Sequence, residues 1–116
     1  MIDDLGGLLE LVATTWPFDE ANYPPLAGAT DEQRLTFALA HVMIHQRKAL
    51  GALATLVDRA DHGQPLDIRE VEPVVWKMLV NALRLAGLAG LSAERLAELI
   101  GDWAALPPGS HPRKRE

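Results

Sequence analysis

Two histidines four residues apart, His41 and His45, are the side chains in this sequence whose type and spacing best suit chemistry. At 3.6 residues per turn they lie on one face of a helix, where imidazole nitrogens can hold Zn²⁺ or a similar transition metal. Such a site needs a further ligand from another helix or from a second subunit. The alternative is structural, with both side chains on a solvated or interhelical stripe. A zinc protease is excluded, because Val42 stands where the His-Glu-x-x-His motif requires glutamate.

Basic side chains on the same stretch allow a different ligand. Lys48 follows the histidine pair by about one helical turn and would repel a bound cation. Together with Arg34 and the two histidines, Lys48 makes a candidate site for a small anion such as phosphate, or for a nucleotide that carries phosphates. Metal binding, anion binding and a structural role therefore all stay open for this face.

A second group of polar residues flanks the turn that follows this stretch. Asp58, Asp61 and His62 are candidate ligands for a cation, although carboxylates near such a turn also cap the next helix and suit its dipole. Asp58 lies 13 residues beyond His45, which is about 20 Å on a straight helix. The two groups therefore cannot share one site within a single chain. Further acidic residues follow the turn: Asp67, Glu70 and Glu72.

Composition excludes several other kinds of site and indicates which elements position these residues. Of the 116 residues, 19 are Leu and 17 are Ala, whereas only 5% are aromatic. Leu and Ala favour helices, so the sequence predicts an all-α fold. The absence of cysteine excludes disulfides, thiolate metal sites and a cysteine nucleophile. Serine occurs only at Ser92 and Ser110, which disfavours a Ser-His-Asp triad.

Charge and hydropathy restrict the partners. The net charge is −5, and residues 1–110 carry 15 acidic and 8 basic side chains, which disfavours nucleic acid and anionic membranes as partners. No apolar run reaches the roughly 18 residues that span a bilayer. The acidic start of the chain also lacks the basic region of a signal peptide. We therefore expect a soluble, cytoplasmic protein with no membrane partner and with a flexible basic tail over residues 107–116.

Four helices are predicted within one domain of residues 1–110. An N-terminal helix and an extended surface connection occupy residues 1–29, and the helical core occupies residues 30–106. Thr30 with Gln33 three residues later forms a capping box at the start of a long helix, and Ser92 is the N-cap of the last helix. The predicted helices cover residues 3–15, 30–60, 72–86 (with an alternative start near 67) and 92–106.

The longest predicted helix is apolar on more than one side. The stripe predicted to face the core consists of Leu35, Leu39, Val42, Gln46, Ala49, Leu53, Leu56 and Ala60. A second apolar flank, with small residues that allow close approach of another helix, consists of Phe37, Ala40, Ile44, Gly51 and Ala54. Two apolar flanks need more than one partner helix, so we expect a four-helix bundle that is completed by homodimerisation.

Residues 83–96, LRLAGLAGLSAERL, resemble the second helix pair of the MazG-like all-α nucleoside triphosphate pyrophosphatases. In that family a Leu-Ala helix end passes through glycine into a short, acidic-capped helix. The long upstream helix, the turn at Asp61-His62-Gly63 and the helix that contains Trp76 follow in the family's order. The resemblance covers about residues 30–105, and it implies an all-α fold with Mg²⁺-dependent release of pyrophosphate from nucleotides.

The two acidic motifs of that family are missing from this sequence. The family holds Mg²⁺ with Glu-Glu-x-x-Glu on one helix and Glu-x-x-Asp on the next, since hard Mg²⁺ requires oxygen ligands. Here residues 33–57 and 73–93 contain no Asp or Glu, and Val74 and Lys77 stand at the Glu-x-x-Asp positions. We therefore expect a MazG-like domain whose chemistry is lost or altered, with Mg²⁺ as a cofactor only if the family activity persists. The alternative is a non-enzymatic helical dimer that binds a protein or a small anion.

Overall fold

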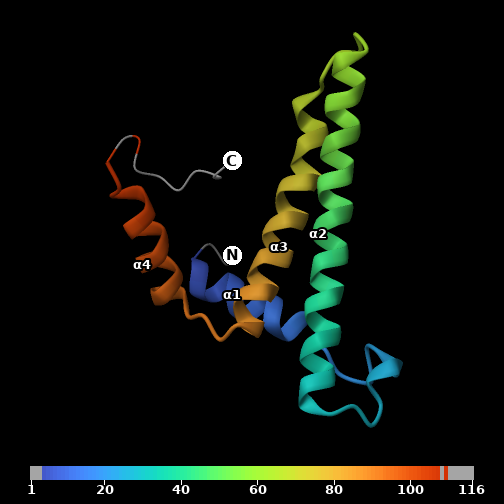
Figure 1. The fold of residues 1–116 in the computed structure, drawn as a ribbon, viewed down its shortest axis with the longest axis vertical. Helices are drawn as coiled ribbons and strands as arrows, with labels where there is room; N and C mark the ends of the chain where they lie inside the picture. The colour runs from blue at the N-terminus through green and yellow to red at the C-terminus, as the bar shows by residue number, and fades with distance from the viewer. Residues whose placement is uncertain (1–3, 108, 110–116) are drawn as a thin grey trace.

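The computed structural model describes residues 4–107 and 109, and it confirms the predicted all-α fold. Within these residues there are four α-helices, two short 3₁₀ turns and no strand (Figure 1). The basic part of the tail and residues 1–3 lie outside the described residues. The elements are α1 (Leu5–Thr15), η1 (Pro24–Leu26), α2 (Asp31–Asp61), η2 (Ile68–Val71), α3 (Glu72–Leu88) and α4 (Ala93–Ala104).

Side-chain caps determine where the helices begin. Thr30 Oγ1 accepts a hydrogen bond from the backbone N–H of Gln33 at 3.1 Å, and Gln33 Oε1 accepts one from the Thr30 N–H at 2.9 Å, which confirms the capping box. Ser92 caps α4 as predicted. Both predicted starts of the third helix are used, because Asp67 caps η2 and α3 continues directly from Glu72.

The core follows the contact between α2 and α3, which run antiparallel (Figure 1). The predicted buried stripe on α2 is partly wrong. Leu35 and Leu39 were expected inside but are 44% and 42% exposed, and the neighbouring Ala38 is buried instead. Apolar residues occupy both of these adjacent stripes, so their spacing alone could not identify the buried one. The buried apolar residues are Leu26, Ala38, Val42, Ala49, Leu56, Val74, Leu83 and Ala86.

The N-terminal segment packs against the end of this hairpin where α2 begins and α3 ends. α1 lies against α3. The connection between α1 and α2 was predicted to be extended and on the surface, but part of it folds into η1 and buries Leu26 to 2% exposure. The Tyr23 N–H donates to the Asp19 carbonyl at 2.8 Å, which turns the chain before η1. The connection is therefore a packed part of the fold.

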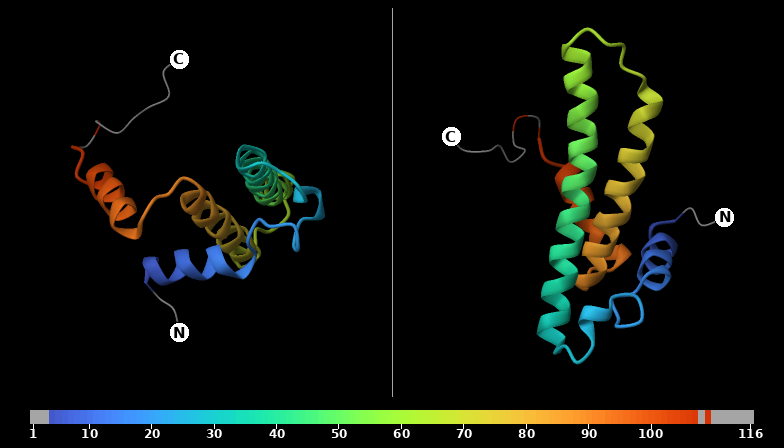
Figure 2. Two further views of the ribbon diagram at one scale, coloured as in Figure 1. Left: turned by 90° about the horizontal axis from the view of Figure 1, so that it is seen from below. Right: turned by 90° about the vertical axis from the view of Figure 1, so that its right-hand side faces the viewer.

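The last helix, α4, extends away from the hairpin (Figure 2). Gly90, with φ of 73°, adopts a left-handed conformation after α3 that a side chain would strain. The α4 axis lies at 114° to the segment that contains η2 and α3, and its main helix contact is with α1. The fold is therefore a packed hairpin of α2 and α3 to which α1 and α4 are attached, and not every helix contacts all the others.

This arrangement is open for a chain of its length. The radius of gyration is 17.5 Å, whereas a compact domain of 116 residues has about 13 Å. No single helix in residues 4–107 is both long enough and apolar enough to cross a membrane. The segment of η2 and α3 meets that criterion only together with α4, across the bend between them.

Candidate functional site

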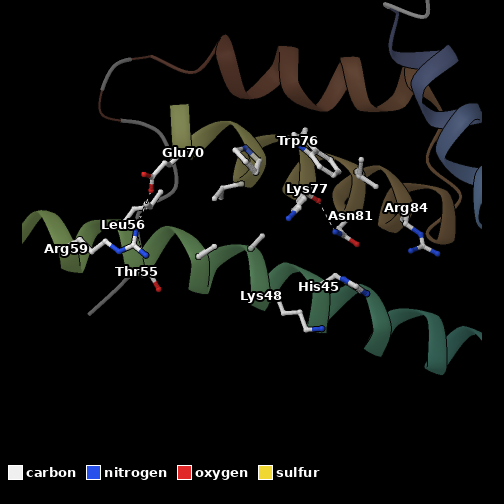
Figure 3. Close-up of a pocket in the computed structure, with 15 residues that line it drawn as sticks. His45, Lys48, Thr55, Leu56, Arg59, Glu70, Trp76, Lys77, Asn81 and Arg84 are labelled. Carbon is white, nitrogen blue, oxygen red and sulfur yellow. Dashed lines mark hydrogen bonds and ion pairs between the residues drawn. The ribbon is translucent and has the colours of Figure 1, made fainter. Parts of the chain in front are cut away.

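A groove of about 780 Å³ runs between α2 and α3 on one face of the hairpin (Figure 3). Lys77, Asn81 and Arg84 extend from α3 toward α2, and His45 lies opposite them on α2 (Figure 3). The groove is lined by His45, Lys48, Ala49, Ala52, Thr55, Leu56 and Arg59 from α2, and by Glu70, Pro73, Val74, Trp76, Lys77, Val80, Asn81 and Arg84 from η2 and α3.

The charged residues of the groove are mostly basic, although the whole chain carries a net charge of −5. Lys48, Arg59, Lys77 and Arg84 line it together with one carboxylate, Glu70. Arg59 Nη1 lies 3.4 Å from Glu70 Oε2, so this single acid is already paired. The lining residues therefore leave an excess of three formal positive charges, without counting His45.

Helix periodicity explains how distant parts of the sequence reach the same groove. On α2, residues 45, 48, 52, 55 and 59 recur at spacings of three and four, which places them along one side of the helix. On α3, residues 73, 77, 80 and 84 repeat the same spacing. Because the two helices run antiparallel, these two stripes border the same side of their contact.

The groove combines its charges with apolar surface and one exposed aromatic ring. The floor of the groove is formed by the buried residues Ala49, Leu56 and Val74. Trp76 lies at the edge of the groove and is 52% exposed. Lys77 Nζ lies 5.6 Å from the centre of the Trp76 ring, in reach of a cation–π contact. The groove thus offers both cations and a flat apolar surface to a ligand.

Arg84 joins the groove to the connection between α1 and α2. Its Nη2 donates to the Trp16 carbonyl at 2.9 Å and to the Tyr23 hydroxyl at 3.3 Å. Its guanidinium carbon lies 4.1 Å from the centre of the Phe18 ring. These contacts hold the guanidinium in one place at the end of the groove.

An aromatic cluster surrounds His41 beside Arg84. The His41 ring centre lies 5.0 Å from that of Tyr23, 5.6 Å from that of Phe18 and 6.0 Å from that of Phe37. His41 Nε2 is 3.4 Å from the Tyr23 hydroxyl, at the limit of a hydrogen bond. This cluster was not predicted from the sequence, because Phe18 and Tyr23 lie in a connection whose path no periodicity describes.

The predicted histidine pair is brought together, but it lacks a visible third ligand. The rings of His41 and His45 are 4.5 Å apart between centres. Within residues 4–107 and 109, no group of three or more His, Cys, Asp or Glu side chains is placed to hold a metal ion. His41 packs against aromatic rings, whereas His45 faces the groove.

The other predicted site residues are separated from one another. Arg34 lies outside the groove, and its separation of 14 positions from Lys48 corresponds to about 21 Å along α2. At the far end of α2, His62 Nδ1 lies 3.6 Å from Asp58 Oδ1. Asp58 and Asp61 border a shallow apolar surface of α2 outside the basic groove. Of the residues predicted to bind an anion, the fold places Lys48 and His45 in the groove.

Mg²⁺ does not fit the donors of the groove. It prefers several oxygen ligands, commonly carboxylates, and here the only carboxylate among the lining residues is Glu70, which pairs with Arg59. Val74 and Lys77 of the lining supply an apolar side chain and a cation. The arrangement is suited to binding an anionic ligand directly.

The environment of His41 predicts a loss of stability in acid. Burial lowers the pKa of His41 below its ordinary value of 6.5, and the charges of His45, Arg84 and Lys48 lower it further. The unfolded chain therefore takes up a proton near pH 6.5 while folded His41 does not, so the free energy of unfolding falls as pH drops through 6.5. The variant His41→Phe, which keeps an aromatic ring, should show a smaller fall.

Urea unfolding of both proteins at pH 8 and pH 5.5 measures this difference. The pH 8 data give the packing effect of the substitution alone, because the imidazole is neutral there in both states. Equal pH dependence in wild type and His41→Phe would contradict the expected coupling.

Comparisons of the chain with models of known families, with curated proteins and with solved structures found no match.

Proposed function

We propose that the groove between α2 and α3 binds a phosphorylated small molecule, with a nucleotide as the best-fitting class, and that it does so without a metal ion. The observation that carries this proposal is the set of lining charges: Lys48, Arg59, Lys77 and Arg84 stand against Glu70 alone. In the Mg²⁺-dependent alternative, carboxylates would hold the metal and the metal would bind the phosphates. In this groove the side chains themselves carry the positive charge.

The chemistry of the lining residues matches the two parts of a nucleotide. A guanidinium binds phosphate oxygens through paired N–H donors, and a lysine ammonium binds them as a point charge. Arg84 and Lys77 offer one of each along α3. The half-exposed Trp76 ring supplies a flat apolar surface on which a base can stack.

We further propose that the protein is a MazG-like domain with a degenerate active site. The groove lies between the two helices that, by the resemblance, would present the metal-binding carboxylates to the substrate. Val74 is buried at one Glu-x-x-Asp position, and Lys77 lines the groove at the other. A lysine at that position repels Mg²⁺ and attracts phosphate, so nucleotide binding is retained in this proposal while metal-assisted hydrolysis is lost.

Calorimetric titration with three probes tests the proposed function. ATP and inorganic tripolyphosphate should bind in the presence of EDTA, whereas adenosine, which has no phosphate, should bind far more weakly. Tighter binding of ATP than of tripolyphosphate would support stacking of the base on Trp76. Binding of adenosine as tight as that of ATP would contradict the role given to the cations.

An activity assay tests the loss of hydrolysis separately. No pyrophosphate should be released from a panel of nucleoside triphosphates with Mg²⁺ or Mn²⁺ at protein concentrations that saturate binding. Robust turnover with either metal would overturn the proposal that the active site is degenerate.

A further inference from the structure

The helix α2 carries two parallel apolar seams, each with the alternating spacing of four and three residues that is typical of packed helix pairs. The first seam consists of Ala38, Val42, His45, Ala49, Ala52 and Leu56. The second seam consists of Leu39, Met43, Gln46, Leu50, Leu53 and Val57. Consecutive residues are about 100° apart around a helix, so the two seams face two directions nearly at right angles. A helix with this pattern has two neighbours.

Among the residues that the structure describes, only the first of these seams packs along another helix. Val42, Ala49 and Leu56 are buried where α2 packs on α3. In the second seam, Met43 is 54% exposed, and Leu39, Leu50 and Val57 are also exposed. This seam is distinct from the flank of small residues whose apolar character predicted a dimer.

The exposed apolar surface continues from α2 onto α3. Val75 and Leu79 are 57% and 49% exposed, and with Ala82 they repeat the spacing of four and three. On both helices these residues lie about 100° from the α2–α3 contact, on the side away from the basic stripes. The hairpin therefore has a basic groove on one face and a continuous apolar surface on the other.

The accessible surface of the chain indicates how much of it a partner would cover. It measures 8925 Å², whereas a folded monomer of 12.7 kDa is expected to expose about 6,200 Å². Setting aside the largest area that the residues outside the described ranges could expose, about 1,800 Å², still leaves a surplus of about 900 Å². A standard interface buries about 800 Å² per partner, so the surplus is sufficient for a stable dimer.

Gln46, in the middle of the second seam, has an unused hydrogen-bonding atom. Its Nε2 donates to the Met78 carbonyl at 3.0 Å, across the contact between α2 and α3. Its Oε1 is buried and accepts no hydrogen bond from the described part of the chain. Buried polar atoms are normally paired, and an unpaired one costs free energy.

The second seam is complementary to itself about Gln46. When two copies of α2 run antiparallel with their Gln46 residues opposite each other, Leu39 faces Leu53 of the partner subunit at the same distance from the centre. Met43, three residues before Gln46, likewise lies near Leu50 of the partner subunit, four residues after Gln46. In this register the two Gln46 residues lie opposite each other at the centre of the contact. A pairing of α2 with the partner's shorter α3 would leave part of the seam uncovered.

We propose that the protein forms a twofold-symmetric dimer in which the second seam of α2 packs antiparallel against the same seam of a second copy, centred on Gln46. The two hairpins then make a four-helix core, and the two basic grooves face outward. Symmetric pairing of one surface with itself is the usual arrangement of homodimers. The dimer does not depend on the function proposed for the groove.

Light scattering after size exclusion at micromolar concentration gives the first test. We expect a mass twice that of the 12.7 kDa chain, and Leu50→Glu should convert the protein to a monomer that keeps its helical circular dichroism. A wild-type monomer would overturn the proposal, whether it stays free in solution or sediments with phospholipid vesicles.

Disulfide cross-linking tests the register of the two α2 helices without disturbing the core. The wild type contains no cysteine, so every cross-link comes from the introduced residues. The double variant Leu39→Cys with Leu53→Cys should form a covalent dimer under mild oxidation. The matched pair Leu39→Cys with Leu50→Cys, which is out of register, should cross-link at least tenfold more slowly. Equal rates in the two variants, or no cross-link in the first, would overturn the antiparallel pairing centred on Gln46.

Discussion

Replacing Lys48 and Lys77 together by glutamate is expected to weaken binding of ATP in the groove by about a hundredfold. Each substitution changes an attraction to the phosphates into a repulsion, and each costs about tenfold in affinity at the effective dielectric of a surface groove. Neither lysine takes part in a described ion pair, and both are exposed. The free energy of unfolding should therefore change by less than about 0.5 kcal/mol.

The control for this experiment carries the same change in net charge away from the groove. Arg47→Glu alters the exposed residue next to Lys48, and Arg95→Glu alters an exposed residue of α4. Calorimetric titration with ATP in EDTA should give a loss of only a few fold for this pair. An equal loss in both double variants would show that the overall charge of the protein, and not the groove, determines binding.

Replacing Val42 by aspartate is expected to lower the free energy of unfolding by about 3–5 kcal/mol. Val42 is 2% exposed in the contact between α2 and α3. Aspartate there must either remain charged without a partner or take up a proton, and both states cost free energy. Because domains of this size are stable by only about 5–15 kcal/mol, much of the population should unfold.

Two matched variants separate the charge from other effects of this substitution. Val42→Thr has nearly the same shape and should cost about 1–2 kcal/mol for its buried hydroxyl. Ala40→Asp introduces the same charge on the exposed side of α2 and should change stability by less than about 1 kcal/mol. Urea unfolding followed by circular dichroism measures all three. A loss at Ala40→Asp equal to that at Val42→Asp would contradict the assignment of the core.

The sequence was sufficient to predict the helices because their signals are local. Thr30 with Gln33, and Ser92, mark helix starts through hydrogen bonds within one turn, and the structure confirms each of them. The choice of buried stripe on α2 was not local. Leu39 and Ala38 are both apolar and only 100° apart, so the position of α3 decides which of them is buried.

The candidate site was harder to predict for the same reason. Lys48 and His45 were identified from their spacing, whereas Lys77 and Arg84 of α3 were not, since the basic stripe that they form becomes a groove only when the two helices are packed. Arg34 was grouped with Lys48 because both are basic and on one helix, although about 21 Å of helix separates them. Sequence spacing gives the face of a helix, and packing gives the depth and the opposite wall of a groove.

The contacts of Arg84 have a consequence for the cost of binding. Its guanidinium is held by the Trp16 carbonyl, the Tyr23 hydroxyl and the Phe18 ring before any ligand arrives. Immobilising a flexible side chain costs about 0.5–1.5 kcal/mol on association. Arg84 is already immobilised in the folded protein, so binding a ligand does not add this cost. Lys48 and Lys77 must still lose their rotational freedom. One end of the groove is therefore preorganised, and the rest adapts to the ligand.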